Sequence, residues 1–348
     1  MGALRMTPRA RLGRLLNSGL HRAMAEDDSV YVLGGDVADP RGGTFRITAG
    51  LSKAYPSRVF GTAASEAAVV GVANGLALTG EKAIVEITSD GFVAQAFDQI
   101  LNMSSRLVSM YGRTLPIHLV VRCPMGSGRG DGGAHGRSLQ RHFLGVPDLH
   151  LFELSPVHDP GEQLAAAIGL GRPSVLFEPR SLYGRYPLAS RAEPGVEVTG
   201  PFGESRWMRL VVAAGAGGPS GAAAEVTVFC AGGTLDRSVR AARALAATGV
   251  TVQLFVPSRL FPFDLEPVTG FVGPGGLVSV VDDGPGPAGW ASAVAAGLAT
   301  RLWGTLRKAP VLLSSAPSVV PAAQELESRV VISSAEIARR LARELRTP

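Results

Sequence analysis

The sequence predicts an α/β fold, with a doubly wound, mostly parallel β-sheet in a first domain and a smaller α/β domain after it. Short apolar runs alternate with helix-like runs along the first half, and a second alternating series follows a stretch rich in Pro, Gly and Ala. Such alternation favours parallel βαβ units. The length of 348 residues suits two domains, and the 46% content of hydrophobic residues suffices for a large core.

In the first half, each expected element rests on its own periodicity. Leu12, Leu16 and Leu20 recur at helical spacing, which predicts an amphipathic N-terminal helix that packs on the core. Strands are expected over residues 30–33, 83–87, 117–121 and 174–177, and helices after Ser65 and over about 91–107.

The pattern changes near Pro187, and from there to Ala224 no stable periodicity remains, which is typical of a linker or of peripheral loops. Beyond it, strands are expected over residues 226–229, 252–256, 277–281 and 311–313, and helices over 238–247 and after Gly289. We therefore predict an α/β domain over residues 1–190, a linker or loops over 191–224, and a C-terminal α/β domain over 225–348. Asp282 and Asp283 are expected to cap the helix that begins near Trp290 rather than to bind a metal.

Composition excludes several classes of function. The net charge of +5 comes from scattered basic residues that are not interleaved with aromatic ones, so we expect no nucleic-acid partner. No apolar run approaches the ~20 residues of a membrane span. Cys123 and Cys230 lie far apart and no secretory segment precedes them, so the expected location is the reducing cytoplasm.

The most informative local pattern is Ser65-Glu66 at the start of an apolar helical run that ends at Gly80. Ser65 suits a helix cap. Glu66 in the first turn has an ordinary interpretation, since a carboxylate there compensates the helix dipole by roughly 0.3–1 kcal/mol. Spacing alone does not separate that role from catalysis.

Seven blocks of sequence favour a catalytic role for Glu66. Their order and spacing match one family along nearly the whole chain. They are Gly34–Val37, Gly42–Arg46 with Gly50-Leu51, Ser65–Ala67, Val85–Ile87, Ala96–Ile100, Pro116–Arg122 and Pro173–Pro179. In these blocks the chain resembles the beta subunits of the thiamine diphosphate-dependent 2-oxo acid dehydrogenases, of the pyruvate and branched-chain type. The resemblance implies a pyrimidine-binding first domain and a C-terminal domain of the transketolase type.

The resemblance also implies roles for individual residues. Glu66 matches the glutamate that hydrogen-bonds N1′ of the cofactor's aminopyrimidine and takes part in general acid–base catalysis relayed through the cofactor. Ala64, Phe92 and Gln95 match positions that contact the same ring, although ordinary helix packing remains an alternative for Phe92 and Gln95. His135, twelve residues before Pro147, matches a histidine near the reacting carbon, and histidine is the residue type whose reference pKa suits proton transfer at neutral pH.

The metal half of such a site is missing from the sequence. The family's diphosphate motif runs from Gly-Asp-Gly to an asparagine some two dozen residues later, whereas every asparagine of this chain precedes Gly130-Asp131-Gly132. We expect no metal ligand here, and a partner alpha subunit that supplies Mg²⁺ and the diphosphate site. The segment 126–136 is predicted to be an active-site loop, with a plain surface loop or an anion-binding nest as alternatives.

Two departures from the family pattern bear on the substrate. Gly35 replaces a glutamate that usually lies close to the cofactor, and Arg137 follows His135-Gly136 where relatives carry His-Ser-Gln-Ser. The resemblance implies an α₂β₂ enzyme that decarboxylates a 2-oxo acid and passes the acyl unit to a lipoyl group of an acyltransferase or, as a carboligase, to a carbonyl. Two alternatives stay open: the C-terminal half of a split transketolase acting on sugars, and a non-catalytic scaffold subunit.

Overall fold

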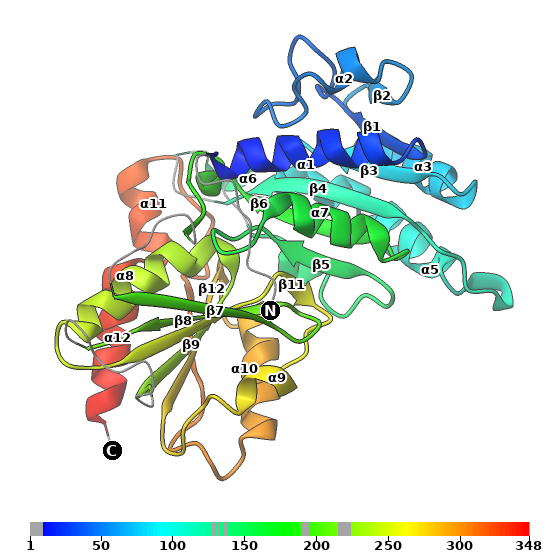
Figure 1. Ribbon diagram of the computed structural model, residues 1–348. Helices are drawn as coiled ribbons and strands as arrows, with labels where there is room; N and C mark the ends of the chain where they lie inside the picture. Colours follow the sequence, from blue (N-terminus) through cyan, green and yellow to red (C-terminus); the bar gives the residue numbers. More distant parts are fainter. Residues whose placement is uncertain are drawn as a thin grey trace. The chain divides into compact units, whose positions relative to one another are not determined.

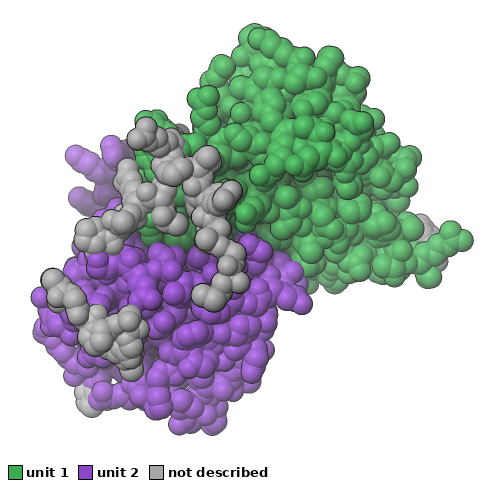
Figure 2. All heavy atoms as spheres, in the orientation of Figure 1, with its two compact units in different colours: residues 1–126, 143–190 green, residues 127–142, 191–348 purple. Residues whose placement is uncertain are grey.

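The computed structural model describes residues 10–126, 130, 132–135, 138–188, 195–214 and 224–347. The chain divides into two compact units, one of residues 1–126 and 143–190 and the other of residues 127–142 and 191–348 (Figure 2). Within the described ranges, no helix combines the length and the apolar character needed to cross a bilayer.

Unit 1 is built on a parallel sheet, in agreement with the predicted fold class (Figure 1). Its strands follow the order β5-β6-β4-β3-β1-β2, and each neighbouring pair is parallel. The strands are β1 (Val30–Gly34), β2 (Val59–Gly61), β3 (Lys82–Glu86), β4 (Leu119–Met125), β5 (His150–Glu153) and β6 (Ser174–Pro179). The predicted strands of the first half correspond to β1, β3, β4 and β6.

Helices cover the sheet of unit 1 on both faces. On one face, α1 (Leu12–Glu26) and α7 (Pro160–Gly169) lie side by side (Figure 1) and pack on Val32, Ile84 and Val120. Side chains alternate along a strand, so the intervening residues point to the other face, where α3 (Glu66–Leu78) packs against β3 and β4. The smaller helical segments of this unit are α2 (Leu51–Ala54), η3 (Met110–Gly112) and η5 (Arg180–Leu182).

The helix predicted over residues 91–107 is present but irregular. It consists of α4 (Asp90–Val93), η1 (Ala94–Ala96), a π-helical η2 (Gln99–Ser104) and α5 (Ser105–Leu107). The Gln99 carbonyl accepts hydrogen bonds from the Asn74 amide of α3, at 3.3 Å, and from the Ser104 hydroxyl, at 3.0 Å. These side chains satisfy a carbonyl in the wide π turn, which is how such an irregularity is stabilised.

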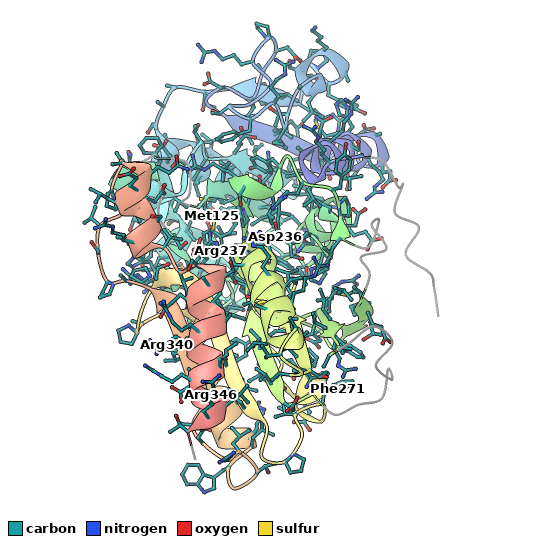
Figure 3. All side chains as sticks on the ribbon, turned by 90° about the vertical axis from the view of Figure 1, so that its left-hand side faces the viewer. Met125, Asp236, Arg237, Phe271, Arg340 and Arg346 are labelled. Carbon is teal, nitrogen blue, oxygen red and sulfur yellow. The ribbon has the colours of Figure 1, made fainter. Side chains whose placement is uncertain are left out.

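Unit 2 contains a mixed sheet in the order β13-β12-β9-β10-β8-β7. Strands β13, β12, β9 and β10 pair in parallel, whereas β8 pairs antiparallel with both β10 and β7. The elements are α6 (Gly132–His135), η4 (Gln140–His142), β7 (Val196–Phe202), β8 (Trp207–Val212), β9 (Val226–Cys230), η7 (Gly232–Thr234), α8 (Leu235–Ala246), β10 (Val252–Val256), β11 (Arg259–Phe261), α9 (Glu266–Thr269), β12 (Leu277–Pro285), α10 (Trp290–Arg301), β13 (Val311–Ser315), α11 (Gln324–Val330) and α12 (Ser334–Arg346). Figure 3 shows α12, with Arg340 and Arg346 labelled, beside α8.

The linker or loop interpretation of residues 191–224 is wrong in part, because β7 and β8 lie within it. β7 is one of the two edge strands of the sheet, and its side chains are all exposed or half-buried. An edge strand of this kind needs no apolar run, so β7 gives no strand signal, whereas Trp207–Val212 of β8 is an apolar run that the linker interpretation overlooks.

The predicted caps of α10 and α3 are confirmed only for Asp282. Asp282 accepts a hydrogen bond from the Ala291 backbone N–H of α10, at 3.4 Å, as predicted, and burial raises its pKa. Asp283 instead pairs with Arg237 at 2.5 Å. Ser65 occupies the cap position of α3, but its hydroxyl makes no capping hydrogen bond.

Candidate active site

A cavity of about 190 Å³ opens in unit 1 at the carboxyl ends of β1 and β3. The chain leaves β1 toward β2 on one side and reaches β3 on the other side, so the strand order reverses at β1. Ligand sites of parallel α/β sheets form at such switch points. The cavity is lined by Gly35, Asp36, Thr62, Ala63, Ala64, Ser65, Glu66, Val69, Glu86, Ile87 and Thr88.

Glu66 lies in this cavity as the first residue of α3, where the N-terminus of the helix favours negative charge. Its side chain is half-buried. Among the described residues, none makes a hydrogen bond or an ion pair with the Glu66 carboxylate. Its oxygens are therefore available to a ligand.

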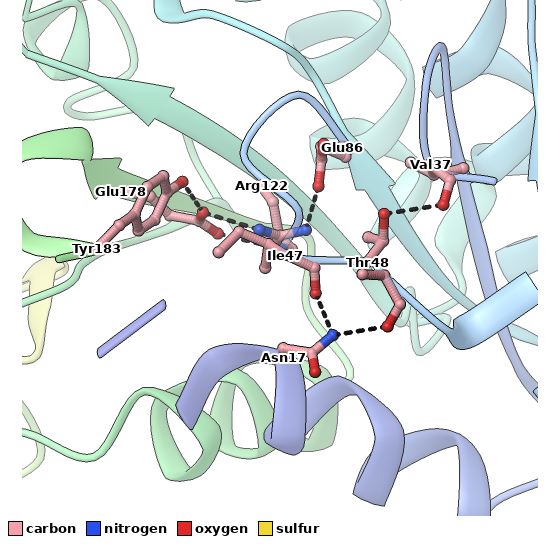
Figure 4. Close-up of polar contacts among 9 residues, drawn as sticks. Asn17, Val37, Ile47, Thr48, Glu86, Arg122, Glu178 and Tyr183 are labelled. Atoms are coloured by element: carbon pink, nitrogen blue, oxygen red, sulfur yellow. Dashed lines mark hydrogen bonds and ion pairs between the residues drawn. The ribbon is translucent and has the colours of Figure 1, made fainter. Parts of the chain in front are cut away.

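A second carboxylate, that of Glu86, reaches the cavity from the end of β3 and belongs to a buried ion network (Figure 4). Arg122 on the adjacent β4 donates from Nη1 to Glu86 Oε2 at 2.6 Å. The same guanidinium donates from Nε and Nη2 to the two oxygens of Glu178 on β6, at 2.7 and 2.9 Å. The Tyr183 hydroxyl donates to Glu178 Oε2 at 2.5 Å.

The protonation of this network follows from burial and from the neighbouring charges. Burial favours the neutral form of Arg122, but the carboxylates of Glu178 and Glu86 outweigh it and raise the pKa of the guanidinium above its ordinary value. Burial also raises the pKa of Tyr183, and the Glu178 carboxylate raises it further. Burial raises the pKa of Glu178 despite the two hydrogen bonds from Arg122. Arg122 therefore stays charged, and Tyr183 stays a neutral donor.

The loop after β1 packs against the Glu86 carboxylate. Gly43 has a φ of +79°, and a Cβ atom there would lie 2.6 Å from Glu86 Oε1 and 3.0 Å from Thr48 Oγ1. The Thr48 hydroxyl donates to the Val37 carbonyl at 2.9 Å, and Asn17 Nδ2 of α1 donates to the Ile47 carbonyl at 2.7 Å (Figure 4). Hydrogen bonds at both ends thus hold this loop beside Glu86.

Not every residue predicted for the site lies in the cavity. The structure brings Ala64 and Glu66 together there. Phe92 in α4 is half-buried and Gln95 in η1 is exposed, and neither is among the described residues that line the cavity. His135 ends α6 in unit 2, and its side chain lies outside what the structure describes, as do Gly136 and Arg137.

Sequence reasoning missed Asp36 and Glu86 as cavity residues. A signal for Glu86 was present, because Glu86, Arg122 and Glu178 each stand at or near the end of an apolar strand. A charge in such a run is rarely buried alone, so each of these residues could be predicted to have a charged partner, but which residues pair depends on the order of the strands.

Comparisons with known proteins identify the family of the chain. The family described as the transketolase pyrimidine binding domain matches residues 11–185, and the transketolase C-terminal domain matches residues 220–337. The chain is 31% identical to the pyruvate dehydrogenase E1 component subunit beta of Leifsonia xyli, over 86% of this chain and 84% of that protein. It is 27% identical to the beta subunit of the acetoin:2,6-dichlorophenolindophenol oxidoreductase of Cupriavidus necator, over 93% and 94% of the two chains.

A solved structure supports the fold. The structure described as a split gene transketolase in an inactive beta4 tetramer superimposes with a TM-score of 0.70 and 17% identity, covering 97% of this chain and 98% of that one.

Proposed function

The chain belongs to the family of beta subunits of the thiamine diphosphate-dependent 2-oxo acid dehydrogenases, and from this premise we propose that it provides the pyrimidine-binding half of a heteromeric enzyme that decarboxylates a 2-oxo acid. The observation that carries the proposal is the position of Glu66. Its carboxylate stands at a helix N-terminus in a cavity at the switch point of the sheet, without a partner among the described residues.

The cavity suits an aminopyrimidine ring. Val69 and Ile87 offer apolar surface, and Glu66 offers an acceptor for a ring nitrogen. Gly35 leaves further room, because a Cβ atom there would meet no other atom within 4 Å. The apolar surface and the carboxylate acceptor both fit the ring, which is the part of thiamine diphosphate that this subunit would hold.

When bound, the cofactor supplies a carbon nucleophile and a ring that relays protons. Glu66 would hold and exchange a proton at N1′ of that ring, which is general acid–base catalysis by a positioned carboxylate. Ala64, next to the start of α3, would contact the ring. Phe92 and Gln95 would do so from the irregular helix after β3, and His135 would handle the substrate carboxylate or the acyl acceptor.

The remaining parts of the site are assigned to other chains. An alpha subunit would supply Mg²⁺ and the diphosphate site, because Asn17, Asn74 and Asn102 all precede the Gly130-Asp131-Gly132 segment. We propose an α₂β₂ heterotetramer in the cytoplasm. A lipoyl-bearing acyltransferase would take the acyl unit in a dehydrogenase, and a carbonyl compound would take it in an acyloin-type carboligase.

Copurification and activity of the complex test the proposal. The full chain is coexpressed with its alpha partner, and mass spectrometry asks whether the partner and thiamine diphosphate copurify with it. The complex is then assayed with pyruvate and with branched 2-oxo acids, in the presence of lipoamide or of an aldehyde. A chain that stays monomeric and free of cofactor would contradict the proposal.

The same preparation separates the alternatives. Activity that survives Glu66→Gln would favour a scaffold subunit. Transfer between a ketose phosphate and an aldose phosphate would favour a split transketolase. The choice between lipoamide and aldehyde as acceptor follows from the same assays.

A further inference from the structure

The buried network beneath the cavity carries more negative charge than a structural ion pair requires. Glu178 takes two donors of the Arg122 guanidinium in a bidentate pair. This pair alone would neutralise Arg122 with good geometry. Glu86 takes a third donor and adds a second carboxylate.

Such a surplus charge is costly. The Arg122 and Glu178 side chains are fully buried, and Glu86 is only 7% exposed. Removing a carboxylate from water is strongly unfavourable unless its surroundings stabilise the charge. A neutral glutamine could make a similar hydrogen bond with Arg122, so packing does not explain the charge. Costly charges of this kind cluster at functional sites.

Glu86 faces the cavity that holds Glu66. The charged and titratable groups around its carboxylate are Arg122 from β4, Glu178 from β6, Tyr183 after η5, Asp36 after β1 and Glu66 from α3. None of the described residues that line the cavity is basic. Asp36 forms an exposed ion pair with Arg41 at 3.1 Å, which leaves the two glutamates to set the charge inside.

From this arrangement we infer that Glu86 is a positioning residue of the active site. Arg122 fixes its carboxylate in place, and the fixed negative charge favours the protonated, cationic form of a nitrogen heterocycle at Glu66. The inference rests on the proposed function and deepens it, since it gives the cavity a preference for one protonation state of its ligand.

The network offers its own matched control. Glu86→Gln and Glu178→Gln each remove one carboxylate from the same guanidinium, but Glu178 is not among the described residues that line the cavity. Glu178→Gln also disturbs more hydrogen bonds than Glu86→Gln, because the Glu178 carboxylate accepts two hydrogen bonds from Arg122 and one from Tyr183. A purely structural role therefore predicts the larger effect for Glu178→Gln, and a role in the cavity predicts the larger effect for Glu86→Gln.

The experiment uses the full chain in complex with its alpha partner and thiamine diphosphate. Isothermal titration gives the cofactor Kd, and a pH titration of the near-ultraviolet circular dichroism gives the midpoint for protonation of the bound ring. We expect Glu86→Gln to weaken cofactor binding about tenfold and to lower that midpoint by about one pH unit, because a nearby negative charge stabilises the protonated form. Glu178→Gln should lower the melting temperature more and shift the midpoint less.

A midpoint that does not move in Glu86→Gln, or that moves more in Glu178→Gln, would overturn the inference. If Glu178→Gln does not fold, Tyr183→Phe, which alters the same distal end of the network, replaces it as control. If Glu86→Gln does not fold while Glu178→Gln does, Glu86 is needed for stability and the inference fails. Failure of the proposed function looks different, because the wild-type complex would then bind no cofactor.

Discussion

Replacing Gly43 by alanine tests whether the Glu86 carboxylate is fixed in place. The φ of +79° at Gly43 costs an alanine about 1–2 kcal/mol. The new Cβ atom would lie 2.6 Å from Glu86 Oε1, and the carboxylate cannot swing away without leaving Arg122. Forcing an atom into such a site adds about 1–3 kcal/mol. We therefore expect a loss of about 2–5 kcal/mol in the free energy of unfolding.

Thermal unfolding followed by circular dichroism measures this loss. For a unit of this size, the melting temperature should fall by roughly 5–15 °C. Gly35→Ala is the control, because Gly35 lines the same cavity but a Cβ atom there meets nothing within 4 Å. We expect that variant to unfold within about 0.5 kcal/mol of the wild type. If Gly43→Ala were equally mild, the carboxylate would be free to move, and the argument that Arg122 holds it would be refuted.

Four further predictions concern single residues. Glu66→Gln in the complex should lower kcat by at least about a hundredfold and stability by no more than about 1 kcal/mol; a comparable kcat would contradict its catalytic role. Gly35→Glu should leave the melting temperature nearly unchanged, because a Cβ atom there meets nothing within 4 Å, and should alter the cofactor Kd by adding a carboxylate to those of Asp36, Glu66 and Glu86; an unchanged Kd would argue against this cavity as the ring site. Asn74→Ala should cost about 1–3 kcal/mol in denaturant unfolding, because it removes the donor to the Gln99 carbonyl; a neutral result would show that η2 does not depend on this contact. Hydrogen bonds from Lys82 and Ser29 lower the pKa of Asp27 from its ordinary value of 3.8 to about 2. The Asp27 carboxylate therefore contributes its full stability above pH 3.8, and this contribution is lost as the pH falls toward 2. The free energy of unfolding of Asp27→Asn should depend less on pH in this range than that of the wild type, and an equal dependence would contradict the assignment.

The sequence allowed the layout of strands to be predicted wherever an apolar run carried the signal. The inner strands β1, β3, β9 and β10 are examples, because both of their faces are covered and every position favours apolar residues. The edge strand β7 carries no such run, so its sequence resembles that of a linker. The π turn at Gln99–Ser104 was missed for another reason: it depends on Asn74, a residue 25 positions away, and local periodicity carries no information about that contact.

The sequence predicts one part of the candidate site, Glu66, but not another, Glu86. Glu66 could be found because a short local pattern, a helix start before an apolar run, coincides with the family blocks. Glu86 could not be assigned to the site without the sheet order, which places Glu86 opposite Arg122 on β4, and Arg122 beside β6. Residues whose role depends on one element can be predicted from sequence, whereas a network that spans three strands requires the register.

The two glutamates of the cavity are held in opposite ways, and this contrast is what the proposed chemistry needs. Glu66 projects from a helix N-terminus without a described partner, so its proton can be exchanged with a ligand. Glu86 is hydrogen-bonded to Arg122 at 2.6 Å and confined by Gly43, so its carboxylate would stay in place while Glu66 exchanges a proton in the proposed reaction. Paired acids in different environments can take different roles, one exchanging protons and the other maintaining the field. A fixed field costs no reorganisation when the proton moves, which is why electrostatic stabilisation is strongest when the charges are held in advance. It follows that the rigidity of the Gly43 loop, and not only the presence of Glu86, should determine how strongly the cavity favours a cationic ring.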